Sequence, residues 1–350
     1  QFREMSDALQ AHLEHVAAGF TSQQRRELLD ALGGAGEHYR EAIYTNGFSG
    51  DKTGLPTADI IAFLKLALKY MDQTIAANRR DDGLYHAYNL MKVDAEGGIS
   101  IRYLYEMLEG QVAVLSSGKL DAAESLDVLK ALRASSLYRA DQHSYILYPN
   151  RKLSDFMEKN CIPDTKAVDP RIASRDCNGV LHFNPVFRNA AMLDEALQQI
   201  NCPEEERKKW LATYEQVFDH QSFTGRSGTF YKYEGLGSIY WHMVSKLLLA
   251  VQEICIKEKG NELLKPLLEA YYDIRKGIGA HKSVQEQGAF PTDPYSHTPS
   301  MMGAQQPGLT GQVKEDFIAR LLEVGVRVEN GCLGFDPFLS DESDVAFTIC

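Results

Sequence analysis

The sequence predicts a mainly helical protein, an (α/α)6-toroid-like barrel of paired helices with a small β element at its C-terminal end. Apolar residues recur at helical spacing through the first two thirds of the chain. Long loops rich in glycine, aromatic and polar residues separate these helical segments, an arrangement typical of toroids whose loops gather around a cleft. The last segment changes to a strand pattern. We therefore expect a toroid domain over residues 1–325 and a small β element over 326–350.

Three long segments carry the clearest helical period. Apolar residues at spacings of three and four predict one helix from Ile60 to Ile75, a second from Ile101 to Leu115 and a third from Leu236 to Ile254. Shorter amphipathic segments follow the same rule, and the spacing predicts roughly ten helices in all.

Local signals mark several element boundaries. Asp121 with Glu124 three residues later resembles a capping box, which predicts a helix start. Pro203 followed by three glutamates has the composition of a first helical turn. Near the end, Gly325 is expected to stop a helix, and Asn330-Gly331 predicts a hairpin turn between two short strands.

The composition excludes several classes of protein. Hydrophobic residues make up 44% and charged residues 24%, which is enough apolar surface for a large core. The formal net charge is -11 and Lys and Arg form no cluster, so we expect no nucleic acid as partner. Apolar runs stay shorter than the ~18 residues that a membrane span needs, so we expect no membrane either.

The six cysteines are widely separated and form no Cys-x-x-Cys pair. This spacing predicts neither a zinc site nor a disulfide framework, so no metal and a reducing cytoplasm are expected. The chain begins at Gln1, and a periplasmic location is the alternative if a leader has been removed.

Three loops have the composition of a sugar-cleaving site, which combines carboxylates, aromatic rings and hydrogen-bonding groups. Residues 79–89 pack two acids, two arginines and two tyrosines into one turn, although a polar, salt-bridged connection between helices is an equally simple interpretation. Residues 176–185 form a turn followed by a short strand bearing His182, which is either a ligand-binding or a structural histidine.

The third loop, residues 225–238, is rich in glycine and precedes the helix predicted from Leu236. Backbone N–H groups at a helix start attract anions, and Ser238 would add a hydroxyl. Glycine also serves tight turns for steric reasons alone, so anion binding and a plain turn both remain open here.

In order and context these loops resemble the cellobiose and chitobiose phosphorylases of the six-hairpin glycosidase clan. In that family a Trp-Asn-Asp-Gly loop carries the catalytic acid, and Asp82 before Gly83 occupies its place. Asn178-Gly179 leading to His182 resembles the family segment that holds a phosphate-binding histidine. A family Thr-Gly-Ser turn with a following aromatic residue is similar to residues 236–241.

The resemblance spans roughly residues 57–255 and has departures. Arg80-Asp81 stands where the family has Trp-Asn, and Leu236 replaces the threonine of the third motif. Residues 290–306 have no counterpart and are expected to form a substrate loop particular to a subgroup. Because Asp82 lies near the start, the chain is expected to be the C-terminal part of a larger enzyme or a shortened relative.

What the resemblance implies is inverting phosphorolysis of a β-linked di- or oligosaccharide. Asp82 would protonate the glycosidic oxygen while inorganic phosphate, a co-substrate, attacks the anomeric carbon, so that no other cofactor is needed. The phosphate-binding candidates are His182, Gly237, Ser238 and Arg226. The substrate-binding candidates are Arg80, Tyr85, Tyr88, Tyr231, Trp241, Asp293 and His297.

Two alternatives remain open at the level of sequence. An inverting hydrolase would need a second carboxylate ~6.5–9.5 Å from the acid to activate water, and Glu234 or Asp293 would supply it. A carbohydrate-binding relative would keep the fold and lack turnover. An oligosaccharide is the expected partner in each case, and a homodimer is a further expected assembly.

Overall fold

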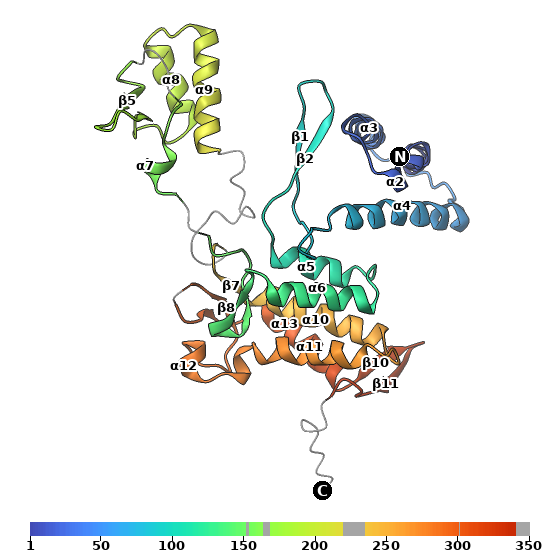
Figure 1. The fold of residues 1–350 in the computed structure, drawn as a ribbon. Helices are drawn as coiled ribbons and strands as arrows, with labels where there is room; N and C mark the ends of the chain where they lie inside the picture. Colours follow the sequence, from blue (N-terminus) through green and yellow to red (C-terminus); the bar gives the residue numbers. More distant parts are fainter. Residues whose placement is uncertain (152–153, 164–168, 220–234, 301, 341–350) are drawn as a thin grey trace. The chain divides into compact units, whose positions relative to one another are not determined.

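The structure is a computed structural model that describes residues 1–151, 154–163, 169–219, 235–300 and 302–340. The chain forms two compact units: residues 1–149 with 232–350 make up unit 1, and residues 150–231 make up unit 2. Within the described ranges there are thirteen α-helices and only short antiparallel sheets, so the protein is mainly helical (Figure 1).

Unit 1 begins with four helices and a hairpin. These are α1 (Phe2–Ala11), α2 (Glu14–Ala18), α3 (Ser22–Asn46), α4 (Thr57–Ala77), β1 (Leu90–Val93) and β2 (Ile99–Arg102). Helices α3 and α4 both contact α1, and α3 also contacts β2. Helix α4 confirms the helix predicted from Ile60 to Ile75, yet much of its apolar face is exposed, including Leu64 and Met71.

The core of unit 1 surrounds one apolar helix. It contains α5 (Leu108–Ser116), α6 (Ala122–Ala134), α10 (Trp241–Lys257), α11 (Leu264–Lys276) and α13 (Gly311–Glu323). Eleven of the 17 residues of α10 are buried, and α10 packs against α5, α11 and α13 (Figure 1). A helix that is apolar on most sides is stable only in such a central position.

Short elements connect the helices of this core. Before unit 2 they are β3 (Tyr138–Arg139), η1 (Ala140–Gln142) and β4 (Ser144–Tyr145). After it they are β7 (Ile239–Tyr240), η4 (Gly279–His281), α12 (Val284–Gln287), β8 (Tyr295–Thr298) and β9 (Gln305–Pro307). Strands β7, β8 and β9 form one antiparallel sheet, so the start of α10 is tied to residues more than fifty positions later.

Several predicted boundaries are confirmed. Asp121 and Glu124 form the capping box of α6, and three glutamates fill the first turn of α9 (Glu204–Phe218) after Pro203. The hairpin of β10 (Val326–Glu329) and β11 (Cys332–Phe335) turns at Asn330-Gly331, where both residues have positive φ. These strands belong to unit 1.

Two predicted helices begin later than expected. The segment from Ile101 starts as β2, and α5 begins only at Leu108. The apolar spacing fits a helix, but the Gly97-Gly98 turn and the alternation of Ile99 and Ile101 fit the hairpin partner of β1 better. Likewise, Leu236 lies in a turn before β7, because pairing with the remote strand β8 replaces the first helical turn.

Unit 2 has a hydrophobic core of its own. It consists of α7 (Phe156–Lys159), β5 (Ala173–Arg175), β6 (Leu181–Phe183), α8 (Ala190–Gln199) and α9. Strand β6 is the predicted short strand that bears His182, and it pairs with β5 in an antiparallel hairpin. Phe183, Tyr214 and Phe218 contact one another through their rings, and Leu193 and Leu197 are fully buried beside them.

Candidate functional site

The turn that bears Asp82 lies between the end of α4 and β1. Its two ends are joined by hydrogen bonds from the Arg80 N–H to the Leu84 carbonyl and from the Gly83 N–H to the Arg80 carbonyl. Gly83 has a φ of +82° and would place an added Cβ 3.3 Å from that of Ala131. Glycine is therefore favoured here by both backbone conformation and space.

Gln111 of α5 fixes this turn to the core. Its buried side chain accepts a hydrogen bond from the Tyr85 N–H at 2.9 Å. Its amide nitrogen donates to the carbonyls of Tyr85 and Met107, each at 2.9 Å. One side chain thus satisfies both backbone groups of Tyr85, and these hydrogen bonds fix the position of the loop relative to α5.

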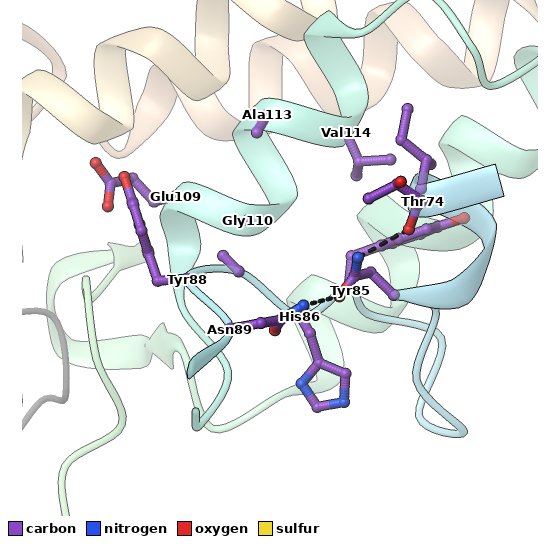
Figure 2. A pocket seen from close by; sticks show the side chains of 12 residues that line it. Thr74, Tyr85, His86, Tyr88, Asn89, Glu109, Gly110, Ala113 and Val114 are labelled. Atoms are coloured by element: carbon purple, nitrogen blue, oxygen red, sulfur yellow. Dashed lines mark hydrogen bonds between the residues drawn. The ribbon is translucent and has the colours of Figure 1, made fainter. Parts of the chain in front are cut away.

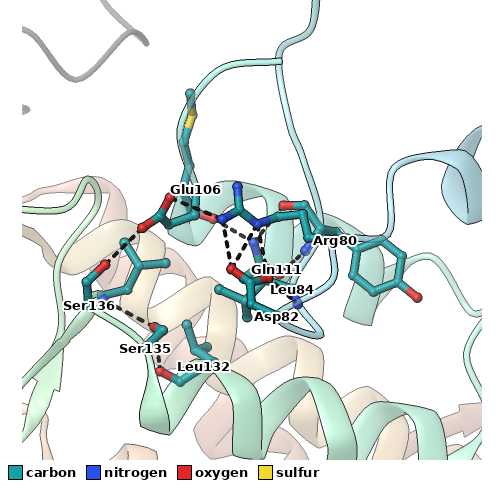
Figure 3. Close-up of polar contacts among 11 residues, drawn as sticks. Arg80, Asp82, Leu84, Glu106, Gln111, Leu132, Ser135 and Ser136 are labelled. Carbon is teal, nitrogen blue, oxygen red and sulfur yellow. Dashed lines mark hydrogen bonds and ion pairs between the residues drawn. The ribbon is translucent and has the colours of Figure 1, made fainter.

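Asp82 forms a bidentate ion pair with Arg80 (Figure 3). Arg80 Nε lies 3.0 Å from Asp82 Oδ1 and Arg80 Nη2 lies 2.7 Å from Oδ2, while the Leu84 N–H donates to Oδ1 at 3.1 Å. The hydrogen bonds from Arg80 are the main reason that the pKa of Asp82 is lowered from its usual value. In this arrangement Asp82 is a carboxylate, although nearly half of its side chain is exposed.

Glu106 holds the other side of the Arg80 guanidinium. Its Oε2 lies 3.4 Å from Arg80 Nη2, and its Oε1 accepts a hydrogen bond from the Ser136 hydroxyl at 2.9 Å (Figure 3). Arg80 therefore bridges two carboxylates. A general acid must carry a proton, so Asp82 can act as one only after the guanidinium moves away from it.

A pocket of about 390 Å³ opens beside the same loop (Figure 2). Tyr85, Tyr88, Asn89 and Glu109 are among its lining residues. Tyr88 is 41% exposed and has a φ of +54°, so its ring is accessible as a platform for a sugar. Tyr85, by contrast, is only 6% exposed.

His86 also lines this pocket, and its ring stacks on Tyr103 with centroids 4.1 Å apart. Burial is the main cause that lowers its pKa, with a second contribution from the nearby Arg80 charge. A neutral imidazole is thereby favoured next to the acidic turn.

The residues of the third motif lie at the start of β7. The carbonyl of Ser238 accepts a hydrogen bond from the Leu147 N–H at 2.9 Å, and the Gly237 N–H donates to the Tyr148 carbonyl at 3.3 Å. The Ser238 side chain is fully buried, and its hydroxyl lies 3.5 Å from the Ile239 carbonyl. Because β7 separates Ser238 from Trp241, the first residue of α10, the predicted anion site at a helix start is not formed by this backbone.

Trp241 and His297 are held by neighbours of the same sheet. The indole N–H of Trp241 donates to Thr298 Oγ1 at 2.8 Å, and the ring is 1% exposed. The ring of His297 stacks on Tyr240 with centroids 4.8 Å apart. Both predicted substrate residues are therefore buried side chains, and Trp241 shares a second cavity with Asp293.

His182 lies inside unit 2. Its Nδ1 contacts the Asn160 carbonyl, and its Nε2 lies 3.3 Å from Asp176 Oδ2. Asp176 in turn accepts hydrogen bonds from the N–H groups of Asn178 and Val180, and these contacts help to lower its pKa. His182 is therefore held inside unit 2 by its Nδ1 contact, while its buried Nε2 faces the Asp176 carboxylate without a hydrogen bond.

The remaining predicted residues, Arg226, Tyr231 and Glu234, lie outside the described residues. Sequence reasoning also missed Glu106, Gln111 and Ser136. The first two stand in the segment interpreted as one continuous helix, and Ser136 follows α6 with no local signal. Only their three-dimensional contacts with the turn around Asp82 give them a role.

The comparisons with known proteins concern mainly unit 2. Residues 153–221 match the family model described as GH149 phosphorylase insertion domain 2, and this range falls entirely within unit 2. No curated protein matches the chain. In the part that the structure describes, no helix is long and apolar enough to cross a membrane. Over these residues the chain is therefore similar to an insertion domain of the GH149 glycoside phosphorylases.

Proposed function

We propose that this chain catalyses inverting phosphorolysis of a β-linked di- or oligosaccharide, with Asp82 as the general acid. The family of the insertion domain supports phosphorolysis as the reaction class. The observation that carries the role of Asp82 is its position on a tight turn that Gln111 anchors to the core, in the same loop as Tyr85 and Tyr88, which line the pocket. A fixed carboxylate next to a sugar-sized pocket is what protonation of a leaving oxygen requires.

In this proposal Arg80 controls when Asp82 can carry the proton that it donates to the glycosidic oxygen. Its guanidinium holds Asp82 ionised while the site is empty, and Glu106 offers it a second carboxylate partner. Phosphate forms strong bidentate pairs with arginine, so a bound phosphate would attract the guanidinium toward itself and Glu106. Asp82, released from the pair, could then take up the proton that it donates to the glycosidic oxygen.

The structure supports Arg80 as the partner of the phosphate in this proposal, because the Ser238 side chain is fully buried and the Gly237 N–H already donates to the Tyr148 carbonyl. The family resemblance suggests His182 as a phosphate ligand, but His182 belongs to the matched insertion domain, where its Nδ1 contacts the Asn160 carbonyl. We therefore assign it a stabilising role in that domain.

We further propose that the helices of unit 1 form part of an α/α toroid, as in the six-hairpin glycosidases and the cellobiose and chitobiose phosphorylases. The paired helices around α10 support this assignment. In the same proposal the toroid extends over residues 1–325 and the β10–β11 hairpin opens the C-terminal β element. An oligosaccharide is the proposed partner, and a homodimer is the proposed assembly.

The test is glycoside turnover on a panel of β-linked disaccharides, with and without inorganic phosphate. Asp82→Asn is compared with Asp127→Asn, which changes an exposed aspartate on α6. The proposal expects sugar 1-phosphate only in the presence of phosphate, lost in Asp82→Asn and retained in Asp127→Asn.

Two other outcomes would each reject the proposal. Free sugar released without phosphate would indicate a hydrolase, in which Glu234 or Asp293 serves as the base. Sugar binding that persists in Asp82→Asn, with no turnover in any form, would indicate a carbohydrate-binding protein.

A further inference from the structure

A second, smaller cavity of unit 1 lies where α10, α12 and α13 meet the segment before β8. Its volume is about 160 Å³. Apolar groups of Trp241, Pro291 and Pro294 form part of its wall. Its polar lining consists mainly of two amides and two carboxylates, from Gln287, Gln312, Asp293 and Asp316.

The polar groups of this cavity lack partners in the folded chain. Gln287 is 2% exposed and Gln312 is 8% exposed, and the Oε1 atom of each has no hydrogen-bond partner. The carboxylates of Asp293 and Asp316 form no hydrogen bond or ion pair with any other described residue. Buried polar groups are nearly always satisfied, so the two amide oxygens indicate a hydrogen-bonding ligand. Asp316 is partly buried and Asp293 is exposed, so their carboxylates are accessible to the same ligand.

The surrounding structure keeps these groups in place. A Cβ added at Gly279 would lie 3.0 Å from the Gln287 amide nitrogen and 2.8 Å from the Pro291 carbonyl oxygen, so Gln287 packs directly on the backbone of η4. Glu323, about two turns further along α13, forms ion pairs with Arg275 at 2.7 Å and Arg320 at 3.0 Å. Arg275 and His281 act on Asp316 only through longer-range electrostatics, so its carboxyl group stays available to the cavity.

The charge state of Asp316 fits the same interpretation. Burial is the main cause that raises its pKa, and the Glu323 charge raises it further. Neutral hydroxyl groups are favourable partners for a carboxyl group in such surroundings, because they supply hydrogen bonds without adding a second negative charge.

We propose that this cavity is a subsite for a single sugar residue, with Asp316 and Gln287 as its specificity-determining hydrogen-bond partners; this rests on the proposed function. Carboxylates accept hydrogen bonds from sugar hydroxyls, and an amide can both donate and accept across two neighbouring hydroxyls. The proline and tryptophan groups offer apolar contact to the faces of the ring. The size of the cavity limits the occupant to one monosaccharide unit.

Trp241 provides a direct optical test. The chain has two tryptophans, and the other, Trp210, lies in unit 2. In a Trp210→Phe protein the fluorescence therefore reports on the cavity alone. We expect at least one of D-glucose, D-galactose, D-mannose and N-acetyl-D-glucosamine to change this fluorescence in a saturable way.

Two variants made in that background connect the signal to the cavity. Asp316→Asn and Gln287→Leu should each weaken the binding of the same sugar at least tenfold, whereas Asp127→Asn should leave it unchanged. Circular dichroism and the melting temperature verify folding for every variant. In the turnover assay the two variants should raise KM for the glycoside while kcat stays within a few fold.

The proposal is overturned if none of the sugars changes the fluorescence, or if the two variants bind sugar and turn over glycoside like the parent. A saturable response to Ca²⁺ alone, lost in Asp316→Asn, would also overturn it and identify a cation site. The experiment also distinguishes a failure of the subsite from a failure of the proposed function. Sugar binding without phosphorolysis would reject the proposed function and retain the subsite. Phosphorolysis that is lost in Asp82→Asn but unaffected by the cavity variants would reject only the subsite.

Discussion

Asp82 and Asp316 belong to the same unit of the molecule but have opposite surroundings. Asp82 lies on a turn, half exposed, with its carboxylate occupied by Arg80 and the Leu84 N–H. Asp316 lies on α13 beside a cavity and has no partner among the described residues. The pKa of Asp82 is lowered chiefly by hydrogen bonds, whereas that of Asp316 is raised chiefly by burial.

This difference shows that the chemistry of a carboxyl group depends on its partners more than on the motif around it. Asp82 was found from its Asp-Gly motif, yet the free chain keeps it ionised. Asp316 carries no recognisable motif, yet burial raises its pKa above the usual value. The following predictions test the comparison, beginning with the largest expected effect.

Replacing each aspartate by asparagine should affect different kinetic constants. Asp82→Asn removes the proposed proton donor, so kcat should fall by about 10²–10⁴-fold. Asp316→Asn should mainly raise KM for the glycoside, because the residue binds sugar in our proposal. Steady-state kinetics with saturating phosphate measure both constants. An equal loss of kcat in both variants would contradict the different roles assigned to Asp82 and Asp316.

Gln111→Leu should detach the turn of Asp82 from α5. The change leaves the N–H and carbonyl of Tyr85 without their partners inside the core, so the free energy of unfolding should drop by roughly 2–4 kcal/mol. Denaturant unfolding measures the loss. Gln23→Leu, an exposed position on α3, is the matched control and should change stability by less than about 0.5 kcal/mol.

Lys282 tests the electrostatics near the cavity, since its ammonium lies 4.7 Å from the centre of the Trp241 ring. Burial, helped by the Arg139 charge, lowers its pKa to about 8. Between about pH 8 and the unfolded value near 10.5 the unfolded chain holds more protons, so stability contributed by this group increases with pH.

The measurement is the unfolding free energy of wild type minus that of Lys282→Met at pH 7.5 and at pH 9.5. This difference should increase in favour of wild type by on the order of 2 kcal/mol at the higher pH. A difference that is independent of pH would show that Lys282 is solvated like a surface lysine.

Arg80→Ala should shift the pH dependence of kcat/KM rather than abolish it. Without the guanidinium the pKa of Asp82 rises toward its usual value, and a general acid stays protonated up to its pKa. The basic limb of the profile should therefore move to higher pH. Arg80→Lys retains the charge but not the bidentate geometry, so its basic limb should lie between those of wild type and Arg80→Ala. A basic limb that does not move in Arg80→Ala would exclude Asp82 as the titrating acid.

Much of the local structure could be predicted from the sequence. The capping box at Asp121, the helix after Pro56 and the turn at Asn330-Gly331 depend on residues a few positions apart, and all three are confirmed. The starts of α5 and α10 were predicted too early. Their sequences fit a helix, but pairing with other strands decides their conformation, and β8 lies far along the chain.

The helical character of the chain and the glycine-containing turn that bears Asp82 follow from the sequence alone, because both depend on local spacing and backbone preference. Only the tertiary structure decided which side chains surround that turn and which polar groups of the second cavity lack partners. Gln111 and Glu106 contact the loop of Asp82, Ser136 in turn contacts Glu106, and Gln287 and Asp316 line one cavity from two helices. Hydrogen bonding and burial in such places are properties of the packed chain, so they set the protonation of each carboxyl group only once the fold has formed.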